Sequence, residues 1–189
     1  MSNSISVFNH VTVDGFFAGP QGETDWFHAI GKDDEFDAYT HEQSRSGSTL
    51  LFGRTTYEMM KSYWPTPDAA KADPEMAEVM NNSPKVVVSK TLEKVEERPN
   101  WKNVRLLREL DRDAILALKK EGNVTILGSG SIVQQLSNLG LIDSYQLFVV
   151  PVVLGSGRSL FEDVRKMDLR LADARSFRNG VSVLQYSRV

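Results

Sequence analysis

Hydrophobic residues recur along the chain in two spacings, and these predict strands and helices that follow one another in alternation. The predicted strands are Ile5–Val13, Thr49–Phe52, Lys85–Val88, Val104–Leu107, Val124–Leu127, Tyr145–Val150, Leu169–Phe177 and Val181–Tyr186. The predicted helices are Glu35–Ser44, Thr55–Tyr63, Pro74–Asn81, Arg112–Glu121 and Ser131–Leu139. Such alternation favours an α/β fold in which helices cover both faces of a central, mostly parallel sheet.

Turn and cap residues mark the ends of several elements. Arg178-Asn179-Gly180 separates the last two strands, and Asn-Gly is a strong hairpin signal, so the sheet should end in an antiparallel C-terminal hairpin. Asp111 should cap the helix that Gly122 ends, and Gly140 should end the next helix. We interpret Ser62–Asp73, which contains two prolines, as a surface excursion.

Composition and charge narrow the class of protein. A chain of 189 residues with 41% apolar and 25% charged residues suits one globular domain, which we place at 1–189. The 22 basic and 25 acidic side chains form no basic stripe, so we expect no nucleic-acid partner. The absence of cysteine excludes disulfides, and His10, His28 and His41 lack metal-ligand spacing, so we expect no metal.

Hydropathy gives no reason to expect a membrane partner. The longest apolar run, Leu147–Leu154, has eight residues, far fewer than the roughly 20 that cross a bilayer. The N-terminus lacks the basic start and apolar core of a secretory signal, so we expect a cytoplasmic location.

The turn after the Val124–Leu127 strand is the first candidate for a site. It contains Gly128, Ser129 and Gly130, followed by Ser131 and Ile132 at the start of a helix. Unpaired amides and the positive end of the helix dipole would favour a phosphate here. The alternative is a tight turn that needs glycine only for its dihedral angles. The turn lacks the third glycine of the Rossmann fingerprint, which disfavours a Rossmann dehydrogenase.

Two further strands also end in polar residues. Gly53, Arg54, Thr55 and Thr56 follow one of them, where either threonine could cap a helix whose amides receive a pyrophosphate; Ser89, Lys90 and Thr91 follow another. The alternative for the first segment is a capped helix with a solvated arginine. All three segments should meet, because ligands bind beyond the carboxyl ends of strands in open α/β sheets.

Positive and hydroxyl side chains among these residues bear on the choice of cofactor. If Arg54, Ser89 and Lys90 surround an adenosine 2′-phosphate, one charged hydrogen bond would contribute about 1.5–3 kcal/mol. That energy corresponds to a roughly 10- to 150-fold preference for NADPH over NADH. We therefore predict NADPH as the cofactor.

The first strand leads into a glycine-rich segment beside aromatic residues. Asp14, Gly15, Phe17 and Ala18 could close over a flat ring, with the Asp14 carboxylate orienting a substrate or relaying a proton. An ordinary turn is the alternative. The glycine-rich loop Pro151–Phe161 either walls a substrate pocket or simply turns the chain.

These segments, in this order, resemble the dihydrofolate reductase-like superfamily, and most closely its RibD C-terminal domain branch. The resemblance runs from about Ile5 to Tyr186 and is carried by Val13–Gly15 with Asp25-Trp26, Gly53–Glu58, Leu127–Gly130 and Val150–Gly157. It implies a three-layer fold with NADPH at one edge and its diphosphate at the Thr55-Thr56 and Gly128–Ile132 helix starts. It also implies that Arg54, Ser89 and Lys90 serve the 2′-phosphate, that Asp14–Ala18 lie by the nicotinamide, and that the chain forms homodimers.

The chain departs from both best-known activities of that superfamily. Asp33, Asp34 and Asp37 compete for the place of the acidic residue that binds the pterin in dihydrofolate reductases, and are better read as N-terminal capping and dipole charges. The Asp-Asp-Pro stretch of the riboflavin enzymes is replaced by Gly53–Thr56.

We therefore predict an NADPH-dependent reductase that transfers hydride to a small polar C=O or C=N substrate. In this hypothesis Asp14 or a bound water supplies the proton, and Trp26, Leu154 and Phe161 shape the substrate pocket. Two alternatives stay open: a 5-amino-6-(5-phosphoribosylamino)uracil reductase of riboflavin biosynthesis, and a non-catalytic NADPH-binding module.

Overall fold

The computed structural model describes residues 2–189, apart from the side chains of His28 and Ala29. Its main sheet has the strand order β5-β4-β3-β6-β1-β7-β10-β9. The strands of this sheet are β1 (Ile5–Thr12), β3 (Thr49–Gly53), β4 (Lys85–Val88), β5 (Val104–Leu107), β6 (Val124–Leu127), β7 (Ser144–Val150), β9 (Leu169–Ser176) and β10 (Ser182–Arg188). The first six strands in the order are parallel, and β10 runs antiparallel to both of its neighbours.

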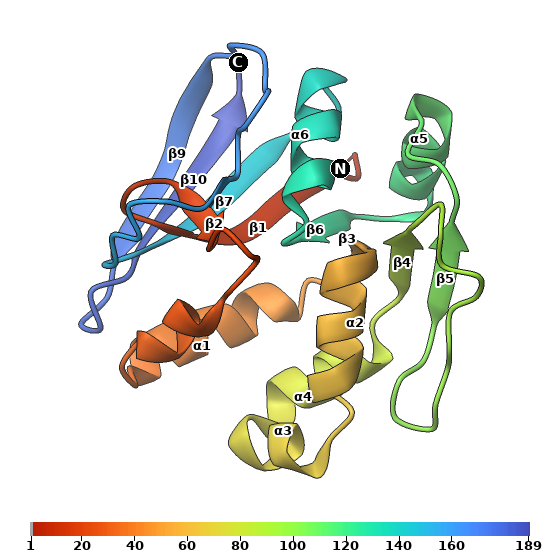
Figure 1. Ribbon diagram of the computed structural model, residues 1–189, viewed down its shortest axis with the longest axis horizontal. Helices are drawn as coiled ribbons and strands as arrows, with labels where there is room; N and C mark the ends of the chain where they lie inside the picture. The colour runs from red at the N-terminus through yellow and green to blue at the C-terminus, as the bar shows by residue number, and fades with distance from the viewer. Residues whose placement is uncertain (1) are drawn as a thin grey trace.

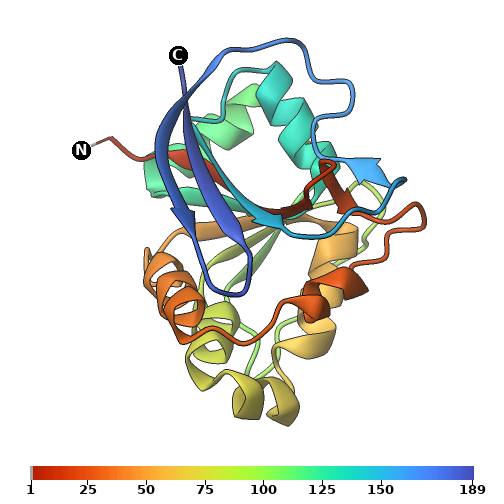
Figure 2. The same ribbon diagram turned by 90° about the vertical axis from the view of Figure 1, so that its left-hand side faces the viewer.

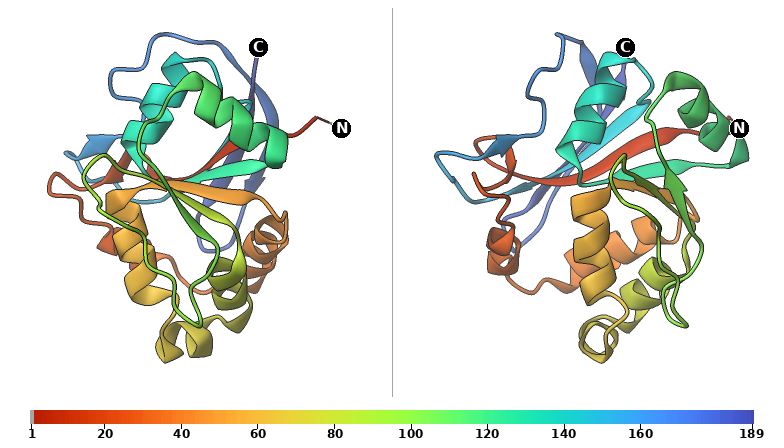
Figure 3. Two further views of the ribbon diagram at one scale, coloured as in Figure 1. Left: turned by 90° about the vertical axis from the view of Figure 1, so that its right-hand side faces the viewer. Right: turned by 45° about the vertical axis from the view of Figure 1, so that its right-hand side comes forward.

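Helices cover both faces of this sheet, so the predicted three-layer arrangement is confirmed (Figures 1 and 3). On one face lie α1 (Asp34–Ser44), α2 (Arg54–Tyr63), α3 (Pro67–Ala72) and α4 (Pro74–Asn82). On the other lie α5 (Arg112–Glu121) and α6 (Gly130–Asn138). The predicted caps also hold, because the Asp111 carboxylate accepts the Ala114 N–H and Gly140 ends the last turn of α6 with a φ of +66°.

The two faces of the sheet bury different sets of side chains because successive strand residues point in opposite directions. Ile5 and Val7 of β1 pack in a cluster with residues of α5 and α6. Phe8, the next residue along the strand after Val7, packs instead against the cluster that contains Phe36 of α1. The alternation of β1 therefore directs Phe8, and with it His10, toward the α1 side.

The predicted C-terminal hairpin is present and faces the viewer in Figure 2. The Phe177 N–H donates to the Val181 carbonyl at 2.9 Å, and Gly180 has a φ of +87°. Glycine is the residue that adopts such an angle without steric cost.

Three features differ from the sequence-based expectation. The segment Ser62–Asp73 is not merely a surface excursion, because it contains α3, whose first residue is Pro67 and whose N-cap Thr66 accepts the Ala69 N–H. A small antiparallel sheet joins β2 (Phe16–Ala18) to β8 (Arg158–Ser159), and a 3-10 helix, η1, covers Asp25–Ala29. The β2–β8 pair escaped prediction because each strand is short and its partner lies far away in the sequence.

Within the described residues, none of the helices combines the length and the apolar character needed to cross a bilayer.

Candidate active site

A cavity of about 1090 Å³ opens where several parallel strands end. Its strand-end part consists of the last residue of β3, Gly53, and of lining residues that follow β3, β4, β5 and β6: Arg54, Thr55, Thr56, Ser89, Lys90, Arg108, Glu109, Leu110, Asp111, Gly128, Ser129, Gly130, Ser131 and Ile132. Its helix-side part lies between the sheet and α1, α2 and α4, and its lining residues are Phe8, His10, Phe27, Phe36, Thr40, Gln43, Ser44, Ser46, Ser48, Leu50, Met59, Met60, Trp64, Asp73, Met76, Val79, Met80, Thr125 and Leu127. Phe17, Ala18 and Arg158, from β2 and β8, also line it.

The register of the sheet explains why the three predicted polar segments meet. Gly53 at the end of β3 pairs with Val88 at the end of β4, and Leu51 pairs with Ile126 of β6. The carboxyl ends of these parallel strands therefore lie side by side, as predicted. Thr91 does not line the cavity but its hydroxyl accepts a hydrogen bond from Arg54 at 3.1 Å.

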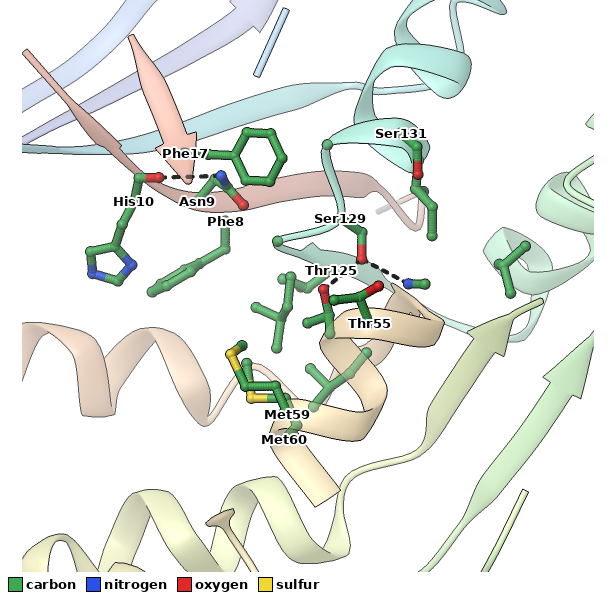
Figure 4. A pocket seen from close by; sticks show the side chains of 18 of the residues that line it. Phe8, Asn9, His10, Phe17, Thr55, Met59, Met60, Thr125, Ser129 and Ser131 are labelled. Atoms are coloured by element: carbon green, nitrogen blue, oxygen red, sulfur yellow. Dashed lines mark hydrogen bonds between the residues drawn. The ribbon is translucent and has the colours of Figure 1, made fainter. Parts of the chain in front are cut away.

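Ser129 joins the two helix starts that face the strand-end part. Its Oγ accepts the Gly53 N–H at 2.7 Å and is hydrogen-bonded to Thr56 Oγ1 at 2.8 Å (Figure 4). This contact corrects the expected capping of α2, because Gly53 occupies the N-cap position and the Thr56 hydroxyl turns toward Ser129. In α6 the Ile132 N–H already donates to the carbonyl of the N-cap residue Ser129 at 2.8 Å. The amides nearest the two helix starts, which have no acceptor within their own helices, are the ones that can meet a ligand.

Glycines keep the space between these helix starts open. Gly128 has a φ of +56°, and a Cβ there would lie 3.4 Å from Thr56 Oγ1. A Cβ on Gly130 would lie only 2.5 Å from the Phe17 ring, so this ring packs directly against the first residue of α6. Phe17 and Ala18 thus take the predicted position beside the cavity, whereas Gly15 does not line it.

The helix-side part is dominated by aromatic and methionine side chains. In Figure 4, Phe8 and His10 project from β1, and Met59 and Met60 project from α2 into the same space. The His10 ring lies 5.0 Å from the Phe27 ring and 4.9 Å from the Phe148 ring, measured between centroids. Burial among these rings lowers the pKa of His10 to about 4, so its imidazole is neutral at pH 7.

Asp14, the predicted catalytic residue, does not line the cavity. Its carboxylate accepts hydrogen bonds from the Thr12 hydroxyl at 2.6 Å, from the Gly155 N–H at 2.8 Å and from the Leu154 N–H at 3.3 Å. The hydrogen bond from Thr12, together with those from the two amides, lowers the pKa of Asp14, so the carboxylate is ionised at neutral pH. Asp14 therefore fastens the β1–β2 turn to the loop after β7, a placement that does not favour it as a proton donor.

The three predicted substrate residues are also placed away from the cavity lining. Trp26 is buried behind Phe27, with the two rings 4.1 Å apart. Leu154 packs on the core beneath α1, and Phe161 lies 5.8 Å from the Tyr145 ring on the opposite face of the sheet. Their sequence neighbours Thr24, Phe27 and Glu162 line the cavity instead.

The acidic residues at the start of α1 have structural positions. Asp33 caps α1 by accepting the Glu35 and Phe36 N–H groups, as predicted, and it also accepts the Asn179 N–H at 3.1 Å. Asp34 and Asp37 do not line the cavity. The α1 side chains that do so are Phe36, Thr40, Gln43 and Ser44, and none of these is acidic.

Sequence reasoning missed the residues that form the helix-side part. A signal was present, since Phe36, Thr40 and Gln43 are spaced four and three residues apart and so share one face of a helix. Phe8 and His10 likewise share one face of a strand. These spacings indicate a common face, but they do not tell whether that face meets the core or a cavity.

Metal-binding side chains do not gather in the described part of the chain, where no group of three His, Cys, Asp or Glu residues has suitable geometry. The side chain of His28 lies outside the described residues.

The architecture is a mostly parallel α/β sheet with two helix starts converging on one cavity beyond the strand ends, the place where open α/β proteins bind ligands. Residues 3–183 match the RibD C-terminal domain family, to which this chain belongs. The chain is 30% identical to YyaP, an uncharacterised protein of Bacillus subtilis strain 168, over 93% of this chain and 90% of YyaP.

Solved structures with the same fold support the predicted fold class. A candidate riboflavin biosynthesis protein from Shewanella sp. PV-4 is 24% identical, with a TM-score of 0.75 over 98% of this chain and 99% of that chain. A pyrimidine reductase-like protein from Corynebacterium diphtheriae is 15% identical, with a TM-score of 0.64 over 99% of this chain and 92% of that one. The dihydrofolate reductase-like fold predicted from the sequence is thereby confirmed.

Proposed function

We propose that this protein is an NADPH-dependent reductase that transfers hydride to a substrate held in the helix-side part of the cavity. The observation that carries the proposal is the junction at Ser129, which brings the starts of α2 and α6 to one opening. The family match and the names of the structural relatives, one of them a pyrimidine reductase-like protein, support a reductase.

The strand-end part fits a dinucleotide phosphate. Two helix starts offer backbone N–H groups and positive dipole ends, and the glycine at 128 leaves room for a ligand to approach them. Arg54 and Lys90 are exposed at the rim beyond the ends of β3 and β4, where each can meet a further phosphate. Ser89, buried beside them, contributes a hydroxyl.

The proposed chemistry is divided between the cofactor and the chain. NADPH, when bound, supplies the hydride from C4 of its nicotinamide. Phe17 and Ala18, which line the cavity next to the start of α6, would limit access of water and orient flat rings. Since Asp14 is ionised and occupied by three hydrogen bonds, we propose that a water molecule supplies the proton.

Calorimetric titration with NADPH and NADH tests the cofactor assignment. We expect Arg54→Ala to weaken NADPH binding by roughly 10- to 150-fold, because one charged hydrogen bond to the 2′-phosphate is lost. NADH binding should change little. Arg170→Ala on the exposed strand β9, far from the cavity, is the matched control and should leave both affinities unchanged.

Three results would count against the proposal. Equal losses for NADPH and NADH in Arg54→Ala would reject the role of Arg54 at the 2′-phosphate. Failure of the wild-type chain to bind either nucleotide would reject the reductase itself, whereas binding without turnover of any carbonyl or imine would favour the non-catalytic module.

A further inference from the structure

The helix-side part of the cavity is a slot with unlike walls. Its sheet wall carries the rings of Phe8 and His10, with Phe27 packed against His10. The opposite wall carries Met59 and Met60 from α2, and Met76 and Met80 from α4. Flexible thioethers adapt to the shape of a ligand and make favourable contacts with aromatic rings. A slot of this kind suits a flat, largely apolar molecule.

Charge is almost absent from this slot. Among its described lining side chains, Asp73 is the only charged one. The Asp73 carboxylate is already engaged, since it accepts the Met76 N–H at 2.9 Å and lies 2.8 Å from His41 Nε2. A buried anion would find no cation here, and leaving an unpaired charge out of water is costly.

The basic side chains of the cavity lie elsewhere. Arg54, Lys90 and Arg108 belong to the strand-end part, and Arg158 belongs to β8; all four are exposed at the rim. Arg108 is in addition occupied, because it donates to the Leu92 and Glu93 carbonyls. The positive charge of the cavity is therefore concentrated where we propose that the cofactor phosphates bind.

Neutral polar groups in the slot can still orient a ligand. His10 is uncharged at pH 7, so its imidazole can offer one N–H donor and one acceptor to a ligand among apolar neighbours. Thr40 and Gln43 add uncharged hydrogen-bonding groups from α1. Together they can fix the position of one carbonyl or imine group without requiring a charged substrate.

We propose that the helix-side part binds an uncharged, planar aromatic ketone, aldehyde or imine, and that it discriminates against phosphorylated substrates. The proposal rests on the proposed reductase function and names its substrate class. Reduction of a ketone of this class adds hydride to the carbonyl carbon and a proton from water to the oxygen. The products are a secondary alcohol and oxidised nicotinamide cofactor.

Two acetophenones test this assignment, and they differ only in the group on the para oxygen, which is methyl in one and phosphoryl in the other. The uncharged probe is 4-methoxyacetophenone, and the charged probe is 4-acetylphenyl phosphate. The full chain is labelled with methyl-13C methionine, and each probe is titrated with and without NADPH while the methyl resonances are followed by NMR. Met59, Met60, Met76 and Met80 report on the slot, and Met167, which packs near Tyr145, is the internal control.

We expect the ketone to shift the four slot methyl resonances and to leave that of Met167 unchanged. The phosphate probe should bind there at least about 100-fold more weakly, because its charge would be buried without a partner. Equal or tighter binding of the phosphate probe at these methyl groups would overturn the proposal. The proposal would also be overturned if the ketone shifted none of the slot methyl resonances, either with or without NADPH.

A charge placed in the slot gives an independent test. Met59 is 42% exposed, so Met59→Lys should be tolerated and should strengthen binding of the phosphate probe by about 10-fold or more. Met59→Leu, the matched apolar control, should keep the preference for the ketone. An unchanged preference in Met59→Lys would contradict the assignment.

The two proposals fail in distinguishable ways. A ketone response without NADPH binding would reject the cofactor but support the ligand class of the slot. NADPH binding combined with a phosphate response at the slot methyl groups would retain the cofactor and reject the uncharged substrate.

Discussion

The strand-end part and the helix-side part meet in one cavity but are built by different means. The strand-end part relies on backbone groups at two helix starts, a left-handed glycine turn and exposed basic side chains. The helix-side part relies on the side chains of β1, α1, α2 and α4, almost all of them uncharged. The first arrangement suits the charged phosphates of the proposed dinucleotide, and the second suits an uncharged ligand.

The largest effect that we predict concerns the titration of His10 in the helix-side part. Its pKa is about 4 in the folded chain and 6.5 as the ordinary value, so the unfolded chain binds the proton first as the pH falls. The free energy of unfolding is therefore unaffected by this group above pH 6.5. It falls by up to about 3 kcal/mol as the pH drops from 6.5 to 4. Urea unfolding between pH 7 and 4 should show a smaller loss for His10→Phe, which keeps an aromatic ring beside Phe27.

The comparison between the two parts supplies the control for this prediction. Ser131→Ala changes an exposed lining residue of the strand-end part and should keep the pH dependence of the wild type. If His10→Phe and the wild type lost stability in parallel, the depressed pKa of His10 would be wrong.

The next prediction concerns the junction between the two helix starts. Ser129→Ala removes the acceptor of the Gly53 N–H and the partner of the Thr56 hydroxyl, and should lower the free energy of unfolding by about 1–3 kcal/mol. NADPH affinity should fall with it, because the helix starts are no longer held together, while the response of the slot methionines to the ketone persists. Loss of both responses to the same extent would mean that the two parts are not separable.

The smallest predicted effect separates the two parts by salt. Raising NaCl from about 0.05 to 0.5 M should weaken NADPH binding roughly threefold or more, because exposed Arg54 and Lys90 are screened. Binding of the uncharged ketone should stay within about 1.5-fold, since it involves no charge pair. Calorimetry at the two salt concentrations measures the first effect, and methionine NMR measures the second. If salt weakened ketone binding as much as NADPH binding, the helix-side part would not be the uncharged site that we propose.

Local sequence was sufficient for the strand-end part and for most of the sheet. The turn Gly128-Ser129-Gly130 and the segment Gly53–Thr56 each carry their signal within a few residues, because glycine and helix-start preferences act over one turn of chain. The parallel order of the strands then places the segments at one edge. The predicted cofactor residues other than Gly15 and Thr91 all line the cavity, although Phe17 and Ala18 reach it from the β2–β8 pair and not from the parallel strands.

The substrate side could not be obtained in the same way. Trp26, Leu154 and Phe161 were plausible because glycines and aromatic residues cluster near them. In the fold, however, Trp26 is buried in the core, and Leu154 and Phe161 are partly buried and pack against it. Asp14 looked free in the sequence, but its partners Leu154 and Gly155 lie 140 and 141 residues away. No local pattern reports a contact over that separation.

By itself, the sequence determined which segments become strands, helices and phosphate-type turns, since those choices depend on side-chain spacing and on backbone preferences within short windows. Tertiary structure alone decided that Ser129 would join the two helix starts, that Asp14 would fasten a loop, and that Met59 would face Phe8 and His10 across a slot. These outcomes depend on which faces pack together across the sheet, and that is set by the packing of the whole domain.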